Sequence, residues 1–202
     1  MFKRLISWPY VGPLAIVFAA FLWSIDALLR QSLYSLPSIF IVFSEHALGL
    51  LITLPWLIKF WPKIKSLNRK TWISIFWIAV FGGLLGTLAY TRALSYINYI
   101  HFSVVVLLQK LQPIFAIILA RIILKERFKG RFYLWATVAL IGSYFVAFPN
   151  ILPQWQDGGK NVWAGLLAVG AAFAWGSSTV MGKYSLREVD SRIVTPLRLG
   201  LT

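Results

Sequence analysis

The chain has 202 residues and a formal net charge of +14; 59% of its residues are hydrophobic and only 13% are charged. A soluble domain is about 45–50% apolar and about 25% charged. This composition therefore excludes a soluble domain and predicts an integral membrane protein. The basic residues cluster in short segments between apolar runs, which argues against nucleic-acid binding. There is no cysteine, which excludes disulfides and thiolate chemistry.

Six apolar runs are long enough to cross a bilayer as helices, which takes about 20 residues. They cover residues 11–29, 38–60, 71–94, 102–127, 132–148 and 162–182, and a seventh run begins at Ile193. The first run lacks a small-residue cleavage site, so it is a helix rather than a signal peptide. The predicted fold is an all-α, polytopic transmembrane helix bundle.

The distribution of lysine and arginine predicts the orientation of these helices. Most of the basic residues lie at the N-terminus and after the second, fourth and sixth runs. The opposite side carries only Arg30, Arg92 and Lys160. Because positive loops stay in the cytoplasm, we expect a multi-pass protein of the cell (inner, plasma) membrane with a cytoplasmic N-terminus. Residues 149–161 are then an extracytoplasmic loop.

Polar residues within the apolar runs are the candidates for function, because a polar group in hydrocarbon is costly without a partner or a wet cavity. The fourth run carries Gln109, Lys110 and Gln112 just before Pro113, which bends helices. Counted at about 1.5 Å per residue, Glu45 and Lys110 lie at similar depths. We therefore expect them to pair, either as a site that changes partners during transport or as a static structural pair.

Further candidates lie in the other runs. Asp26 is near enough to the outer face to pair with Arg92, and His46 follows Glu45 directly. Trp23, Tyr90 and Trp175 could form aromatic walls around an apolar or cationic solute, although packing against lipid or helices is the alternative for each.

A short repeat links the first and sixth runs. AAFLWS at residues 19–24 recurs as AAFAWG at residues 171–176. The second copy lies five helices after the first, so it crosses the membrane in the opposite direction. This predicts an inverted-topology repeat with a site near the midplane, unless the match is a coincidence of composition.

Three motifs together resemble the EamA family of the drug/metabolite transporter superfamily. The first is a tryptophan followed by a small residue and then a basic residue in the first run. The second is Tyr90-x-x-Ala93-Leu94. The third is LQKLQPIFA at residues 108–116 followed by LKER at residues 124–127. The resemblance implies ten helices in two inverted five-helix repeats that transport small metabolites. Residues 1–148 would be the first repeat, and residues 162–202 would begin a second, truncated one.

The expected function is therefore alternating-access transport of a small metabolite or drug across the lipid bilayer, in the direction of export and linked to protons through Glu45 or Asp26. The alternative is a non-transporting membrane subunit whose repeat pairs with a second chain, and a homodimer is one form of this. We expect no enzymatic activity, cofactor or metal, because His46 and His101 cannot complete a three-ligand site. The predicted substrate-binding residues are Trp23, Asp26, Glu45, His46, Tyr90, Gln109, Lys110, Gln112 and Trp175.

Overall fold

The computed structural model describes residues 10–33, 35–96, 102–147 and 159–202, and these contain helices and turns but no strand. Among them, five helices are long and apolar enough to cross a membrane. They are Val11–Arg30, Ser38–Lys59, Arg69–Leu94, Phe102–Ile123 and Val162–Ser185. The predicted all-α polytopic bundle is thus confirmed. The fifth apolar run forms helix α9 (Gly130–Ala147), which is not among the five.

The chain divides into two compact units, Met1–Leu36 and Pro37–Thr202. The first unit contains helix α2 (Val11–Ser32), in which Asp26 accepts a hydrogen bond from Arg30 Nε at 2.7 Å. A one-turn spacing brings these two side chains together on the same helix face. Within its own unit, Asp26 thus has Arg30 as a partner, and the expected pairing with Arg92 stays a prediction. Arg92, in the second unit, lies over the Tyr96 ring at 5.3 Å.

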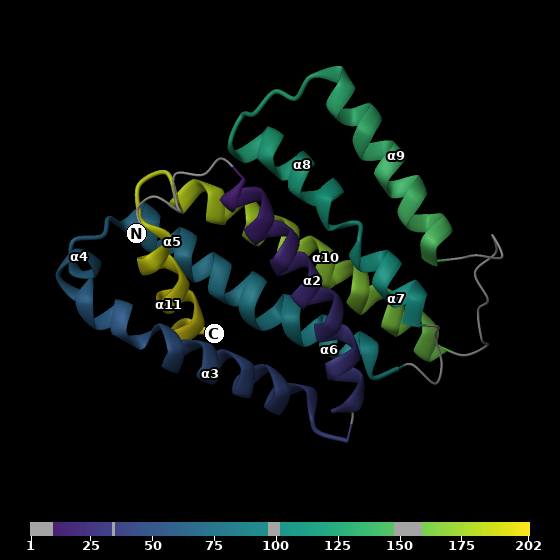
Figure 1. Cartoon of the computed structure of the whole chain (residues 1–202), viewed down its shortest axis with the longest axis horizontal. Helices are drawn as coiled ribbons and strands as arrows, with labels where there is room; N and C mark the ends of the chain where they lie inside the picture. The colour runs from purple at the N-terminus through teal and green to yellow at the C-terminus, as the bar shows by residue number, and fades with distance from the viewer. Residues whose placement is uncertain (1–9, 34, 97–101, 148–158) are drawn as a thin grey trace. The chain divides into compact units, whose positions relative to one another are not determined.

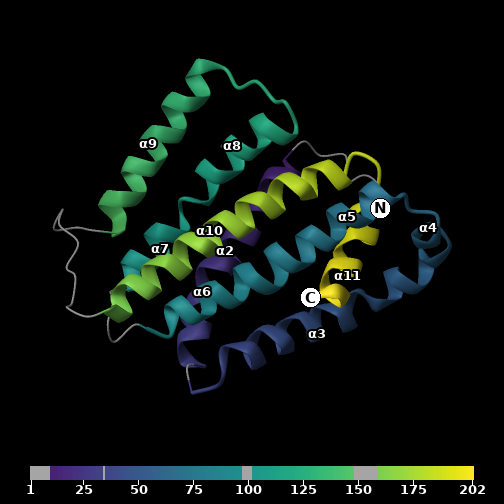
Figure 2. The ribbon, with the colours of Figure 1, turned by 180° about the vertical axis from the view of Figure 1, so that it is seen from behind.

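The second unit is built around one long helix, α10 (Gly159–Ser185) (Figures 1 and 2). Its other elements are α3 (Ser38–Lys59), α4 (Trp61–Lys65), α5 (Arg69–Trp77), η1 (Ile78–Leu85), α6 (Gly86–Leu94), α7 (Phe102–Gln109), α8 (Gln112–Ile123), α9 and α11 (Ser191–Leu201). On one side α10 packs against α5, η1 and α6, and on the other against α7 and α8. Small side chains allow this close packing, and Ala164, Ala168, Ala171 and Ala172 are fully buried.

The third membrane span is continuous but not uniform, because its middle part, η1, is a π-helix. The sequence predicted one helix over residues 71–94. Gly82 packs directly against α10, because a Cβ added at Gly82 would collide with Ser178 Oγ. The π-helical geometry was not predicted.

The fourth span is interrupted, whereas the sequence predicted one helix over residues 102–127. Helix α7 ends at Gln109 and α8 begins at Gln112. At the break the Leu111 N–H bonds to the carbonyl of Leu108, three residues back, at 3.2 Å. Pro113 has no N–H with which to restore the α-helical pattern. The span then ends at Ile123, before the charged LKER segment.

Polar contacts join the segments at one end of the second unit. Asn68 caps α5 by accepting the Thr71 N–H at 2.8 Å, and its amide donates to Glu188 Oε2 at 2.8 Å. Glu126 forms ion pairs with Lys183 at 2.8 Å and with Arg187 at 3.5 Å. These contacts tie the basic segments after α4 and α8 to the end of α10.

Candidate functional site

Two aromatic side chains meet at the middle of α10. The ring of buried Tyr90 on α6 lies 5.1 Å from the ring of Trp175, centroid to centroid, at an angle of 58°. The Trp175 indole N–H donates to the main-chain oxygen of Gly82 at 2.9 Å. Both residues were predicted to bind substrate, and the structure brings them together.

Two glutamines at the break between α7 and α8 reach the same helix. Buried Gln109 donates from Nε2 to Gln112 Oε1 at 3.1 Å, and Gln112 donates from Nε2 to Thr179 Oγ1 at 3.4 Å. Thr179 in turn donates to the carbonyl of Trp175 at 2.8 Å. Thr179, to which Gln112 donates, is thus one helical turn from Trp175 on α10. We call Tyr90, Gln109, Gln112 and Trp175 the aromatic–amide cluster.

A glycine on α10 allows α8 to approach closely enough for these contacts. A Cβ at Gly176 would lie 2.9 Å from Phe115 Cβ and 3.0 Å from the carbonyl oxygen of Gln112. Contacts this short do not occur between real side chains, so only glycine fits here. Gly176 therefore serves the packing of α10 against α8.

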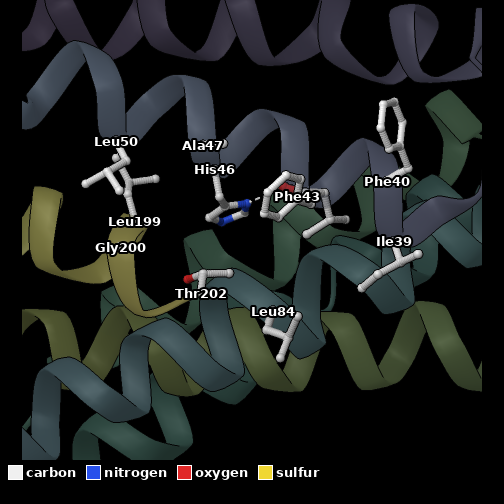
Figure 3. A pocket seen from close by; sticks show the side chains of 11 residues that line it. Ile39, Phe40, Phe43, His46, Ala47, Leu50, Leu84, Leu199, Gly200 and Thr202 are labelled. Atoms are coloured by element: carbon white, nitrogen blue, oxygen red, sulfur yellow. Dashed lines mark hydrogen bonds between the residues drawn. The ribbon is translucent and has the colours of Figure 1, made fainter.

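His46 lines a separate, largely apolar cavity of about 590 Å³ between α3, η1 and α11 (Figure 3). Its Nδ1 lies 2.8 Å from the carbonyl oxygen of Val42, so this nitrogen has a partner within α3. Figure 3 shows the imidazole between the α3 and α11 sides of the cavity, with Thr202 opposite. The cavity has a volume typical of ligand pockets, about 300–1,000 Å³. Its lining residues are Ile39, Phe40, Val42, Phe43, His46, Ala47, Leu50, Leu84, Leu199, Gly200 and Thr202.

Glu45, the neighbour of His46, lies within electrostatic range of Arg198 on α11. Arg198 Nε is buried and has no hydrogen-bond partner among the described residues. The seventh apolar run thus places a basic residue, Arg198, near Glu45.

Lys110 occupies a different place. It lines a cavity of about 380 Å³ between α8 and α9, with Tyr133 and Thr137 among the other lining residues. It forms no ion pair with any residue that the structure describes, so the expected Glu45–Lys110 pair is not present. Equal depth did not make the two residues neighbours, because α6 and α10 lie between α3 and α7–α8 (Figures 1 and 2).

The predicted residues therefore fall into four groups. Tyr90, Gln109, Gln112 and Trp175 form the aromatic–amide cluster. Glu45 and His46 lie on α3 beside α11, and Lys110 lies in the α8–α9 cavity. Trp23 and Asp26 belong to α2 in the first unit. Roles in binding substrate stay predictions for all of them.

Three contributors to these sites were not predicted from the sequence: Thr179, Arg198, and the π-helix with its Gly82 acceptor. The sequence carried a signal for two of them. The GGLLG run at residues 82–86 marks the π-helix, and the arginine one turn into the seventh apolar run is Arg198. Among the described residues no cluster of three or more potential metal ligands occurs.

These features define a multi-pass, all-α membrane protein. The chain belongs to the EamA-like transporter family, which matches residues 10–148. It is 41% identical over 193 residues to the riboflavin transporter ImpX of Fusobacterium nucleatum. That alignment covers 95% of this chain and 64% of the relative, so the chain spans less than two thirds of the relative's length. No solved structure matches the chain. The family resemblance found in the sequence is confirmed.

Proposed function

We propose that this chain forms part of a small-molecule transporter and that its substrate is riboflavin or a similar planar heteroaromatic solute. The observation that carries the proposal is the 41% identity, over 95% of the chain, to a relative named as a riboflavin transporter. The family assignment supports transport in general. The aromatic–amide cluster supports a planar substrate in particular.

The chemistry of a flavin matches that cluster. Its ring system is flat and apolar across both faces, and one edge is an imide with an N–H between two carbonyl groups. Aromatic side chains such as Tyr90 and Trp175 stack on a flat ring. Glutamine amides such as Gln109 and Gln112 donate and accept hydrogen bonds at once, as an imide edge requires. Pockets that combine apolar walls with a few polar groups are typical of small-molecule sites.

The proposed mechanism is alternating access between inverted repeats. Residues 1–148 form the first repeat and residues 162–202 begin the second, so Trp23 and Trp175 occupy equivalent positions in opposite orientations. Family membership supports this division. In such transporters the site lies near the bilayer midplane, where helices are interrupted. The break at Lys110 and Leu111 is an interruption of this kind.

The direction, coupling and assembly of the transporter are further parts of the proposal. The basic segments favour a plasma-membrane protein with a cytoplasmic N-terminus. We propose export, with Glu45 as the group that carries a proton. Asp26, whose carboxylate accepts a hydrogen bond from Arg30, is the alternative proton carrier. A homodimer stays a prediction.

Binding to the purified full-length protein tests the substrate class. Riboflavin should quench tryptophan fluorescence saturably, and lumiflavin, which keeps the ring system but lacks the ribityl chain, should compete. D-ribitol, which has the chain without the rings, should not. The absence of saturable riboflavin binding, or competition by ribitol alone, would contradict the proposed recognition of the flavin rings.

A further inference from the structure

The main-chain oxygen of Gly82 accepts hydrogen bonds from side chains instead of from the main-chain N–H that an α-helix would supply. In an α-helix the N–H of residue 86 would bond to the carbonyl of residue 82. In η1 the Gly86 N–H bonds instead to the carbonyl of Phe81, five residues back. The oxygen of Gly82 accepts from the Trp175 indole at 2.9 Å and from Thr87 Oγ1 at 3.2 Å. The π-helix thereby makes a main-chain acceptor available to a side chain of another helix.

Because it has no side chain, Gly86 leaves room for the π-helix and for the Trp175 indole. A Cβ at this position would lie 2.8 Å from Cδ1 and from Nε1 of Trp175. It would also lie 2.8 Å from the carbonyl oxygen of Phe81, the acceptor of the π-helical bond. Any side chain at residue 86 therefore conflicts with the π-helix and with the position of the indole at once. Both contacts involve rigid groups that cannot move aside independently.

The resulting position of Trp175 is fixed on several sides. Gly82 holds the indole N–H, Gly86 lies against its five-membered ring, and the Tyr90 ring lies 5.1 Å away. Other close glycine contacts in this region do not involve the indole, since Gly83 faces Thr202 and Gly176 faces α8. Plain helix packing accounts for those two glycines but not for a carbonyl that binds the indole N–H.

We infer that Gly82 and Gly86 are positioning residues for substrate binding: through the π-helix they fix the orientation in which Trp175 presents its ring. This inference rests on the proposed function, in which the ring contacts a planar substrate. It assigns a role to the π-helix, which neither the family nor the named relative specifies. Changes at Gly86 should then act on substrate affinity through Trp175.

Fluorine NMR of the full-length protein labelled with 5-fluorotryptophan tests the first half of the inference without any substrate. Trp175→Phe assigns the Trp175 resonance. In Gly86→Ala that resonance should shift or broaden. It should stay unchanged in Gly142→Ala, because nothing lies within 4 Å of a Cβ added at Gly142 on α9. An unchanged Trp175 resonance in Gly86→Ala would overturn the inference.

Transport kinetics test the second half. Gly86→Ala should raise the KM for riboflavin about tenfold and change kcat less than about twofold, since a misaligned ring weakens binding throughout the cycle. A purely structural role would instead lower the amount of folded protein and kcat at unchanged KM, and that result would overturn the inference.

A measurement on the unmodified protein covers the case in which Gly86→Ala does not fold. Hydrogen exchange of the Trp175 indole N–H should be much slower than that of exposed Trp61 in α4. Equal exchange rates would contradict the bond to Gly82. Slow exchange in a protein that does not bind riboflavin would leave the positioning of Trp175 intact and reject only the proposed substrate.

Discussion

Trp175 on α10 donates its indole N–H to the main-chain oxygen of Gly82 in η1, at a distance of 2.9 Å. This bond joins the third and sixth apolar runs of the chain, which lie 93 residues apart at the two bonded residues. The Gly82 oxygen is available for this bond because η1 is a π-helix. The bond therefore connects an irregular segment of backbone to an aromatic side chain in the candidate site. Irregular helical turns of this type are frequent at functional sites.

The proposed recognition of the imide edge by Gln109 gives a prediction about substrate selectivity. Riboflavin methylated on the imide nitrogen has lost the N–H donor, so the intact protein should discriminate against it about tenfold or more. Gln109→Leu should weaken riboflavin transport and largely abolish that discrimination. Thr137→Val, in the α8–α9 cavity, serves as the control and should keep it. Discrimination retained in Gln109→Leu would exclude Gln109 from imide recognition.

The close approach of α8 to α10 predicts a local stability effect. Gly176→Ala should lower the free energy of unfolding by about 1–3 kcal/mol, because the added methyl group meets Phe115 and the main chain of α8. Gly170→Ala, on the same helix, is the matched control, since nothing lies within 4 Å of a Cβ there. Denaturant unfolding in detergent measures both. Equal stabilities of the two variants would show that the helices do not approach as described.

The ion pairs of Glu126 should contribute only modestly to stability. Their basic partners, Lys183 and Arg187, are exposed, and pairs of this kind are screened by solvent. Glu126→Gln should therefore lower the free energy of unfolding by less than about 1 kcal/mol, and the difference should shrink in high salt. A loss of several kcal/mol that salt does not reduce would indicate a buried network instead.

Asp190 predicts a pH dependence at the start of α11. Its carboxylate accepts the Arg192 N–H at 2.8 Å and pairs with the Arg192 side chain at 2.7 Å, and these bonds lower the pKa of Asp190 from 3.8 to about 2. A lowered pKa in the folded state means that the stabilisation is complete above about pH 4 and is lost as the pH falls towards 2. An NMR titration of the Asp190 carboxyl carbon should have its midpoint near 2. A midpoint at the ordinary value would show that these bonds do not form.

Glu45 is the proposed proton carrier, and its substitution should remove the pH dependence of transport. Glu45→Gln keeps the size of the side chain but cannot release a proton. The variant should show a flat profile of riboflavin transport against pH, whereas the unmodified protein should respond to pH. Identical profiles for the two proteins would reject proton coupling at this residue.

Much of the fold follows from the sequence because hydropathy alone determines which segments enter a membrane. The spans at residues 38–60 and 71–94 therefore correspond closely to helices in the structure. The break at Lys110 was not located, because Pro113 signals a bend without specifying where the hydrogen-bond pattern changes. The π-helix was missed for a similar reason: its glycines also suit ordinary packing, and only the contacts with Trp175 distinguish the two.

The candidate site was predicted in part. Tyr90, Gln109 and Gln112 lie on helices that neighbour the helix of Trp175, because α6, α7 and α8 all pack on α10. The Glu45–Lys110 pair was wrong because depth in the membrane gives one coordinate only. Which helices are neighbours depends on tertiary packing, and no local pattern in the chain encodes it.

The proposed function requires that the full-length protein moves riboflavin across a membrane. Proteoliposomes containing the purified protein test it directly when radiolabelled riboflavin is supplied on one side and its appearance on the other is followed. We predict saturable transport that exceeds that of protein-free liposomes and that unlabelled riboflavin inhibits. Riboflavin movement equal to that of protein-free liposomes, at every pH gradient applied, would contradict the claim.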